Sequence, residues 1–177
     1  MYSSLYERIK FIMAYTTINK STLHFNTKLY TGTGSSASIT GVGFQPDWVW
    51  IKRRNATQSH VLFDPLRGVT KRIMTNETAA EETDAQILTA FNSDGFSLGT
   101  SSQVNDSGSG HVSWNWKANG IGSSNTDGTI NSTYTSANTT SGLSIVTYTG
   151  TGSAATVGHG LGTTPSMVWI FNRTDGG

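Results

Sequence analysis

Residues 111–117 show the most regular alternation of polar and apolar side chains in the chain. Val112, Trp114 and Trp116 occupy every second position, and polar residues stand between them. Successive side chains of a β-strand point to opposite faces of its sheet, so this period of two predicts a strand with one buried face. We expect Val112, Trp114 and Trp116 to lie in the core.

A second strand is predicted at residues 48–52, where both faces carry bulky groups. Trp48 and Trp50 alternate with Val49 and Ile51. Apolar residues on both faces are typical of a strand that is covered on each side. We therefore expect this strand to be central in its sheet, with Val49 and Ile51 in the core.

Other short runs of apolar and β-branched residues lie between groups of Gly, Asn, Asp and Ser, which favour turns. The predicted strands are residues 25–31, 60–64, 96–99 and 143–149, and Phe96 is expected in the core. One short helix is predicted at residues 77–88, because Thr75 or Asn76 could cap it and its first turns are acidic. The pattern predicts an all-β, antiparallel β-sandwich with at most one short helix.

The opening of this sandwich is repeated later in the chain. The matched stretches are residues 30–35 with 148–153, 46–51 with 165–170, and Arg54 with Arg173. Such a long period indicates tandem domains, since the repeats of a solenoid are only a few tens of residues long.

The repeat divides the chain into four predicted segments. Residues 1–13 are expected to form a disordered extension and residues 14–119 the sandwich. Residues 120–142 are rich in Gly, Ser, Thr and Asn, which is typical of a linker. Residues 143–177 are expected to be the truncated start of a second copy.

Composition excludes several partners and cofactors. Only 13% of the residues are charged and the net charge is +1, so no overall field favours nucleic acid or an anionic membrane surface. The chain has no cysteine, which excludes thiolate metal sites and cysteine nucleophiles. No apolar run reaches the ~20 residues of a membrane-spanning helix, and residues 1–12 lack the pattern of a signal peptide. We expect synthesis in the cytoplasm and no membrane insertion.

Acidic and histidine side chains are the remaining candidates for catalysis or metal binding. They include Asp64, Glu81, Glu82, Asp94, His24, His60, His111 and His159. None belongs to a known catalytic motif, and the Asn- and Asp-rich turns lack the spacing of a calcium-binding loop. We predict no catalytic residue, no metal site and no cofactor.

The five tryptophans suggest carbohydrate binding, because flat rings beside hydrogen-bonding groups suit the faces of sugars. Since Trp114 and Trp116 are assigned to packing, other residues are predicted to bind the ligand. These predicted ligand-binding residues are Trp48, Trp50, Arg53, His60 and Arg67. Arg67 is also expected to pair with Asp64 at a turn.

Several motifs together resemble a known module. They lie at residues 63–68, 93–99, 104–118, 128–150 and 158–165. In this order they are similar to the repeated, β-rich structural modules of marine tailed phages, especially cyanophages, and the similarity covers residues 14–177. The resemblance implies a concanavalin-like or LamG-like jelly roll, with a tail-fibre role or an unknown one and without catalytic residues.

From this resemblance we expect a structural module of a phage virion. It would belong to a tail fibre or surface appendage that recognises a host-surface glycan or takes part in virion assembly. Other virion chains would be its partners, and phage fibres as a class are commonly trimeric. Two alternatives stay open, namely a polysaccharide-degrading tail protein and a purely structural spacer or capsid-decorating module.

Overall fold

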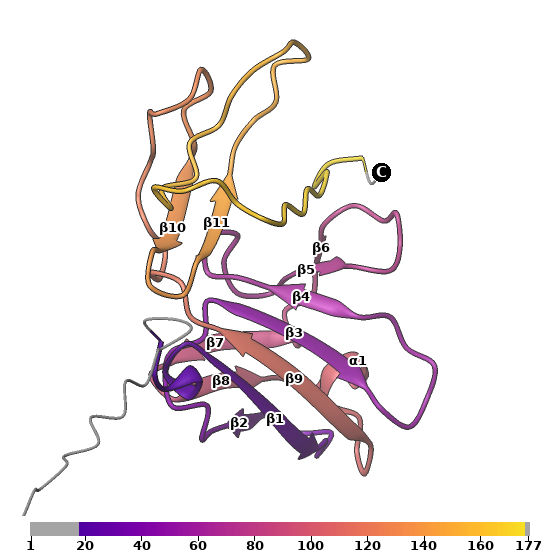
Figure 1. The fold of residues 1–177 in the computed structure, drawn as a ribbon. Coiled ribbons are helices and arrows are strands. Elements are labelled where there is room, and N and C mark those ends of the chain that lie inside the picture. The colour runs from indigo at the N-terminus through magenta and orange to yellow at the C-terminus, as the bar shows by residue number, and fades with distance from the viewer. Residues whose placement is uncertain (1–17, 176–177) are drawn as a thin grey trace, which may run out of the picture.

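The computed structural model describes residues 18–175, and nearly all of its regular structure is antiparallel β-sheet (Figure 1). The predicted extension at residues 1–13 therefore lies outside the described residues. The six-stranded sheet contains, in spatial order, β1 (Phe25–Thr31), β9 (Gly110–Trp116), β3 (Trp48–Arg53), β4 (Val61–Phe63), β5 (Lys71–Met74) and β6 (Glu82–Thr83). The three-stranded sheet contains β2 (Ala37–Ile39), β8 (Gly95–Leu98) and β7 (Leu88–Asn92).

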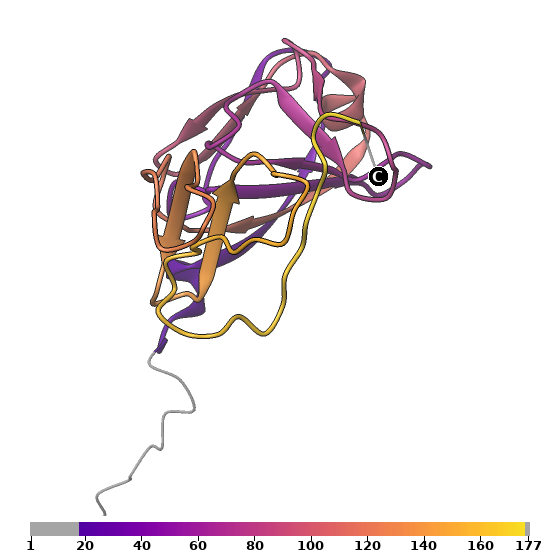
Figure 2. The ribbon, with the colours of Figure 1, turned by 90° about the horizontal axis from the view of Figure 1, so that it is seen from above.

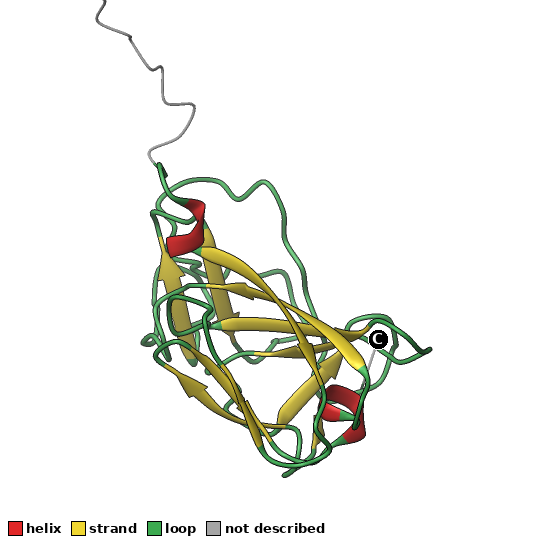
Figure 3. Ribbon diagram, turned by 90° about the horizontal axis from the view of Figure 1, so that it is seen from below, coloured by secondary structure: helices red, strands yellow, loops and turns green. Residues whose placement is uncertain are grey.

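Two further parts complete the fold. A separate hairpin is formed by β10 (Tyr134–Asn138) and β11 (Leu143–Thr147). The helices of the described residues are the short η1 (Ser21–Leu23) and α1 (Ser102–Asn105), shown in red in Figure 3. The prediction of an all-β, antiparallel sandwich is confirmed.

The main core lies between the six-stranded and the three-stranded sheets. Its fully buried members are Val49, Ile51, Val61, Phe63, Ile87, Leu88, Phe96, Leu98 and Val104. Most come from β3 and β4 in the larger sheet and from β7 and β8 in the smaller one, while Ile87 directly precedes β7 and Val104 belongs to α1. Burial of these groups from water is the main stabilising contribution to the sandwich. Val49, Ile51 and Phe96 lie where the alternation of the sequence predicted them.

The tryptophans of β9 occupy the opposite face of the large sheet, which corrects the prediction for Trp114 and Trp116. Trp50 pairs with Trp114, and Trp48 pairs with Trp116. Paired residues share a face, so these side chains point away from the core residues of β3. Trp114 and Trp116 are only half-buried, whereas Val112, on the same face, is buried.

The face of β9 that meets the core side is polar, and its hydrogen bonds explain why it can be buried. His111, Ser113 and Asn115 are all fully buried. The Asn115 side-chain amide donates to Ser113 Oγ at 3.0 Å and to the Asn26 carbonyl at 3.0 Å. The His111 ring stacks on Tyr30 with 5.2 Å between the ring centroids. These partners offset part of the cost of removing the polar groups from water, while His111 Nε2 and Asn115 Oδ1 are buried without a hydrogen-bond partner among residues 18–175.

The predicted helix at residues 77–88 does not form. This segment contains turns, the two-residue strand β6 and the first residue of β7. Lys71 and Arg72 of β5 pair with Thr83 and Glu82 of β6, so long-range pairing replaces the local helical preference. Ile87 and Leu88, at the end of this segment, are fully buried in the main core.

The segment predicted as a linker, residues 120–142, is structured. It contains β10, which pairs with β11 along its whole length, and Ser123 bridges to Thr135. The hairpin packs on the outer face of the large sheet through a small cluster of Leu66, Ala118 and Ile145, with Trp48 and Leu143 against it. Figure 2 shows the hairpin beside the strands of the sandwich.

The turn in the first matched stretch has the same local hydrogen bond in both copies, although Tyr30 and Thr31 belong to β1 while Tyr148 and Thr149 follow the end of β11. In one copy Thr33 Oγ1 donates to the Ser35 carbonyl, and in the other Thr151 Oγ1 donates to the Ser153 carbonyl. The glycines at matching positions also share positive φ angles. These are Gly34 (70°) with Gly152 (73°), Gly41 (76°) with Gly160 (70°), and Gly43 (91°) with Gly162 (69°).

The second matched stretch differs between the copies. Residues 48–53 form β3, but residues 167–170 form no strand, and Met167, Val168 and Ile170 are each at least 65% exposed. The yellow end of the chain in Figure 1 runs from the hairpin toward β5 and β6. Tandem domains remain a prediction, supported by the shared turns but not by this segment.

Candidate recognition surface

The outer face of the large sheet carries two rows of aromatic side chains. The register aligns Phe25, Trp116 and Trp48 in one row across β1, β9 and β3. The next row contains Trp114 and Trp50. We call these five residues the aromatic face. Strands lie ~4.8 Å apart and alternate residues follow at ~6.6 Å, so the five rings form one continuous surface.

Ring contacts connect the members of each row of the aromatic face. The ring centroids of Phe25 and Trp116 are 4.6 Å apart, those of Trp116 and Trp48 6.4 Å, and those of Trp50 and Trp114 5.2 Å. Tilted and edge-on arrangements at these distances are favourable for aromatic pairs. The rings therefore hold one another in place and form a preorganised surface.

The aromatic face also offers hydrogen-bond donors. The Trp50 indole N–H donates to Thr75 Oγ1 at 3.0 Å, and the Trp50 ring contacts His60 at 5.8 Å. Among the described residues, the indole N–H groups of Trp48, Trp114 and Trp116 have no hydrogen-bond partner. Trp114 and Trp116 are half-buried, so part of each side chain is open to a ligand.

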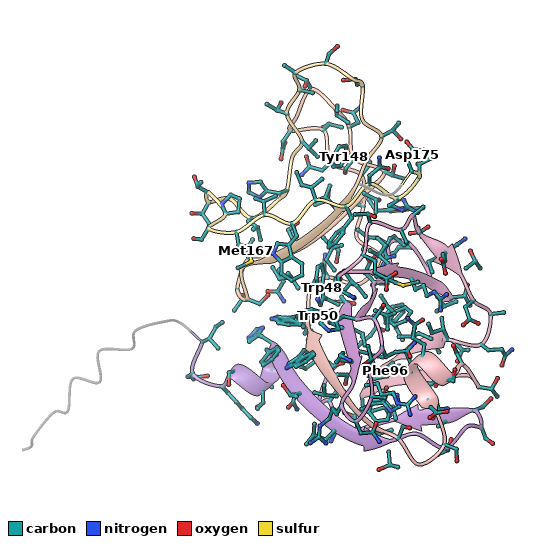
Figure 4. All side chains as sticks on the ribbon, turned by 90° about the vertical axis from the view of Figure 1, so that its right-hand side faces the viewer. Trp48, Trp50, Phe96, Tyr148, Met167 and Asp175 are labelled. Atoms are coloured by element: carbon teal, nitrogen blue, oxygen red, sulfur yellow. The ribbon has the colours of Figure 1, made fainter. Side chains whose placement is uncertain are left out.

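The C-terminal segment covers one side of the aromatic face. The Trp169 ring lies 5.8 Å from Trp48 and 5.7 Å from Trp50, centroid to centroid. Figure 4 shows Trp48 and Trp50 between the segment that carries Met167 and the sandwich that contains Phe96. The ring contacts of Trp169 do not extend to Phe25, Trp114 or Trp116, which we call the open side.

An ion pair fixes the C-terminal segment at its far end. Arg173 donates to both carboxylate oxygens of Glu81 at 2.9 Å, and the Glu81 backbone N–H donates to the Arg173 carbonyl at 3.0 Å. Burial acts to raise the pKa of Glu81, but the hydrogen bonds and charges of Arg173 and Arg67 lower it overall. Glu81 is thus an ionised anchor for this segment.

Two predicted ligand-binding residues lie away from the aromatic face. Arg53 pairs with Asp106 at 2.9 Å at the end of β3. Arg67 is 3% exposed and bonds to Asp64 at 2.6 Å, to Glu81 at 3.2 Å and to the Leu62 carbonyl at 2.9 Å. Arg67 is therefore structural, as its expected pairing with Asp64 implies. The structure brings together Trp48, Trp50 and His60.

The candidate carboxylates have structural partners instead of facing one another. Asp64 and Glu81 bind Arg67, and the Glu82 carboxylate binds Arg72. Asp94 accepts the backbone N–H groups of Gly43 at 2.6 Å and Gly41 at 2.9 Å, and these bonds lower its pKa. Asp64 and Glu81 both bind Arg67, but the pKa of Glu81 is lowered, whereas the general acid of a glycosidase has a raised pKa.

The histidines are separated by the large sheet. His60 contacts the outer face, whereas His111 lies on the core side, where burial lowers its pKa. Within residues 18–175 no group of three or more His, Asp or Glu side chains is arranged to hold a metal ion.

Sequence reasoning missed Phe25, Trp114, Trp116 and Trp169 as members of this surface. The alternation in residues 111–117 shows that Val112, Trp114 and Trp116 share a face. It does not show which face meets the second sheet. The sequence repeat matches Trp169 with Trp50, and this match was the available signal for Trp169. The contact between the two rings depends on the tertiary structure.

The fold and this surface define an all-β sandwich domain with an aromatic outer face. The chain belongs to the family described as "Domain of unknown function (DUF7483)", whose model matches residues 20–177. The match thus spans the sandwich, the hairpin and the C-terminal segment. No curated protein and no solved structure matches the chain. Among residues 18–175 no helix has the length and apolar character needed to cross a membrane.

Proposed function

We propose that the chain is a recognition module of a tailed-phage appendage that binds a host-surface glycan through the open side of the aromatic face. The observation that carries the proposal is the set of half-buried Phe25, Trp114 and Trp116 rings on the outside of the sheet, where Phe25 contacts Trp116 and Trp114 contacts Trp50. The phage context rests on the resemblance of the sequence to phage structural modules.

The chemistry of this side suits a neutral sugar. A pyranose ring presents an apolar C–H face that can stack on an indole, and its hydroxyl groups need nearby polar partners. The free indole N–H groups of Trp114 and Trp116 can donate to them. Thr27, which pairs with Trp114, and Lys52, which pairs with Val112, flank the rings on the same face.

Binding without cleavage is favoured over polysaccharide degradation. A glycosidase needs an acid and a second carboxylate beside the bound sugar. The carboxylates of Asp64, Glu81 and Glu82 are instead paired with arginines, and Asp94 is bonded to backbone at a turn. The proposal is therefore a binding module.

A glycan array probed with the whole chain tests the proposal. We expect binding to one group of neutral glycans and no release of reducing sugar from them. Trp116→Ala should weaken binding at least tenfold, since removal of a stacking ring is worth about 1.5 kcal/mol or more. Tyr148→Ala is the matched control, because Tyr148 is an exposed aromatic outside the face, and it should leave binding unchanged.

Two outcomes of the array would count against a glycan-binding role. Binding that Trp116→Ala and Tyr148→Ala reduce equally would move the site elsewhere. Release of oligosaccharide would make the chain an enzyme.

A structural or assembly role is the second candidate. It is favoured by a specific observation, namely that Trp169 of the C-terminal segment already packs against Trp48 and Trp50. In this case the aromatic face would join modules to each other, and the array would show no binding.

A further inference from the structure

The contact between Trp50 and Trp169 joins two residues that are equivalent in the sequence repeat. Trp50 and Ile51 match Trp169 and Ile170, and Arg54 matches Arg173. Both stretches therefore carry the motif Trp-Ile-x-x-Arg. When a residue contacts its own counterpart, the contact has the form of an isologous interface, in which the same patch is used by both partners.

The docking site for this motif has two parts on the sandwich. The first part is formed by Trp48 and Trp50, whose rings both contact the tryptophan of the motif, Trp169. Glu81, whose side chain is 11% exposed, holds the arginine by two hydrogen bonds from Arg173. The site thus combines two aromatic rings with a carboxylate that is largely removed from water. Residues of these kinds often dominate the binding energy of protein interfaces.

The first copy of the motif carries the same two side chains, but its arginine makes no side-chain contact of this kind in the described part of the chain. Trp50 is on the outer face, and the Arg54 side chain is exposed, with no hydrogen bond or ion pair among the described residues. Arg54 is thus free to reach the Glu81 carboxylate of another molecule.

We infer that the aromatic face is a self-association surface that binds the Trp50-Ile51-x-x-Arg54 motif of a second copy of the chain. In this dimer Trp50 of each molecule lies against Trp50 of the other, and each Arg54 pairs with the opposite Glu81. The C-terminal segment makes the same contacts within one molecule and therefore competes with dimerisation. This inference does not depend on glycan binding, because it uses the Trp48 and Trp50 side of the face.

Sedimentation velocity of the whole chain and its variants tests the inference. The wild type should be mainly monomeric, since its own segment fills the site. Trp169→Ser combined with Arg173→Gln should release the segment and produce a dimer. Trp169 is 47% exposed and the Arg173 side chain 43% exposed, both outside regular strands, so the variant should keep its fold, which circular dichroism checks.

A further substitution in the released variant identifies the interface. Arg54→Gln should weaken the dimer roughly tenfold, because Glu81 of the other molecule then keeps only its own Arg67 and loses the pairing across the interface. Lys20→Gln, at an exposed lysine outside the face, is the matched control and should leave the dimer unchanged. A released variant that stays monomeric would overturn the inference, as would a dimer that Arg54→Gln and Lys20→Gln affect equally.

The single variant Arg173→Gln provides an independent measurement if the double variant does not fold. A synthetic peptide of residues 165–174 should bind to an Arg173→Gln chain and lose its affinity when Glu81 is changed to Gln. Equal binding to both chains would contradict the docking site.

Discussion

At the scale of single residues, the face of a strand decides what an aromatic side chain contributes to stability. Phe96 is fully buried between the two sheets, whereas Trp114 is half-buried on the outer face. A fully buried ring loses its transfer free energy and leaves a cavity when it is removed. A half-exposed ring loses less, because water reaches the vacated space.

Phe96→Ala should therefore destabilise the fold more than Trp114→Ala, although tryptophan is the larger residue. We expect a loss of ~3–5 kcal/mol in the free energy of unfolding for Phe96→Ala. The loss for Trp114→Ala should be ~1 kcal/mol, the usual size for a partly exposed site. Urea denaturation measures both values. A larger loss for Trp114→Ala would place that ring in the core.

Acid should weaken the turn at Asp94. The bonds from Gly43 and Gly41 lower the pKa of Asp94 in the folded state, so its stabilising effect is present above the unfolded pKa of ~3.9. The effect is lost as the pH falls through the folded-state pKa. The stability advantage of the wild type over Asp94→Asn should stay constant near neutral pH and shrink below about pH 4. Denaturant unfolding from pH 3 to 7 measures this, and a difference that grows on acidification would have the wrong sign.

Single residues also show what the sequence could and could not predict. Val49 and Ile51 were placed in the core correctly, because their strand has bulky groups on both faces. For Trp114 the period of two was correct, but the choice of face was not. His111, Ser113 and Asn115 are buried with hydrogen bonds and a stacked ring around them, and two of these partners, Asn26 and Tyr30, come from β1.

At the scale of elements, close approach between strands restricts Gly95, the first residue of β8. Its φ angle is +146°, and a Cβ atom there would lie 1.9 Å from the Ile39 carbonyl oxygen of β2. Ile39 pairs with Phe96, so any side chain at position 95 would push β2 away from β8. Glycine is required by both the backbone angle and the space.

Gly95→Ala should cost ~3 kcal/mol or more, from backbone strain together with the clash. Gly108→Ala is the matched control, because Gly108 has a φ of 73° with nothing within 4 Å of the added atom. It should cost only ~1–2 kcal/mol, the strain of a left-handed residue. Thermal and urea unfolding compare the two variants, and equal losses would show that the close contact with β2 is absent.

Strand prediction succeeded where the local pattern was strong. Residues 25–31 coincide with β1, and residues 48–52 lie within β3, which is central as expected. It failed at residues 77–88, because β6 has only two residues and exists through its pairing with β5. The predicted linker failed for a similar reason, since the polar strand β10 is defined by its partner β11.

At the scale of the whole molecule, the large sheet is packed on both of its faces. The three-stranded sheet covers the core side, and the hairpin with the C-terminal segment covers the Trp48 side of the outer face. The sequence predicted that both faces of β3 are covered. It did not predict that the hairpin and the C-terminal segment cover the outer face. The aromatic face is therefore partly an internal contact and partly an exposed surface, and both proposals depend on this division.

Hydroxyl-radical footprinting of the whole chain, read out by mass spectrometry and normalised to the unfolded protein, tests this division most directly. We predict rapid oxidation of Trp114 and Trp116, strong protection of Phe96, and faster oxidation of Trp48 and Trp50 when Trp169 is changed to Ala. Protection of Trp114 and Trp116 equal to that of Phe96, with no response of Trp48 and Trp50 to the loss of Trp169, would contradict the account.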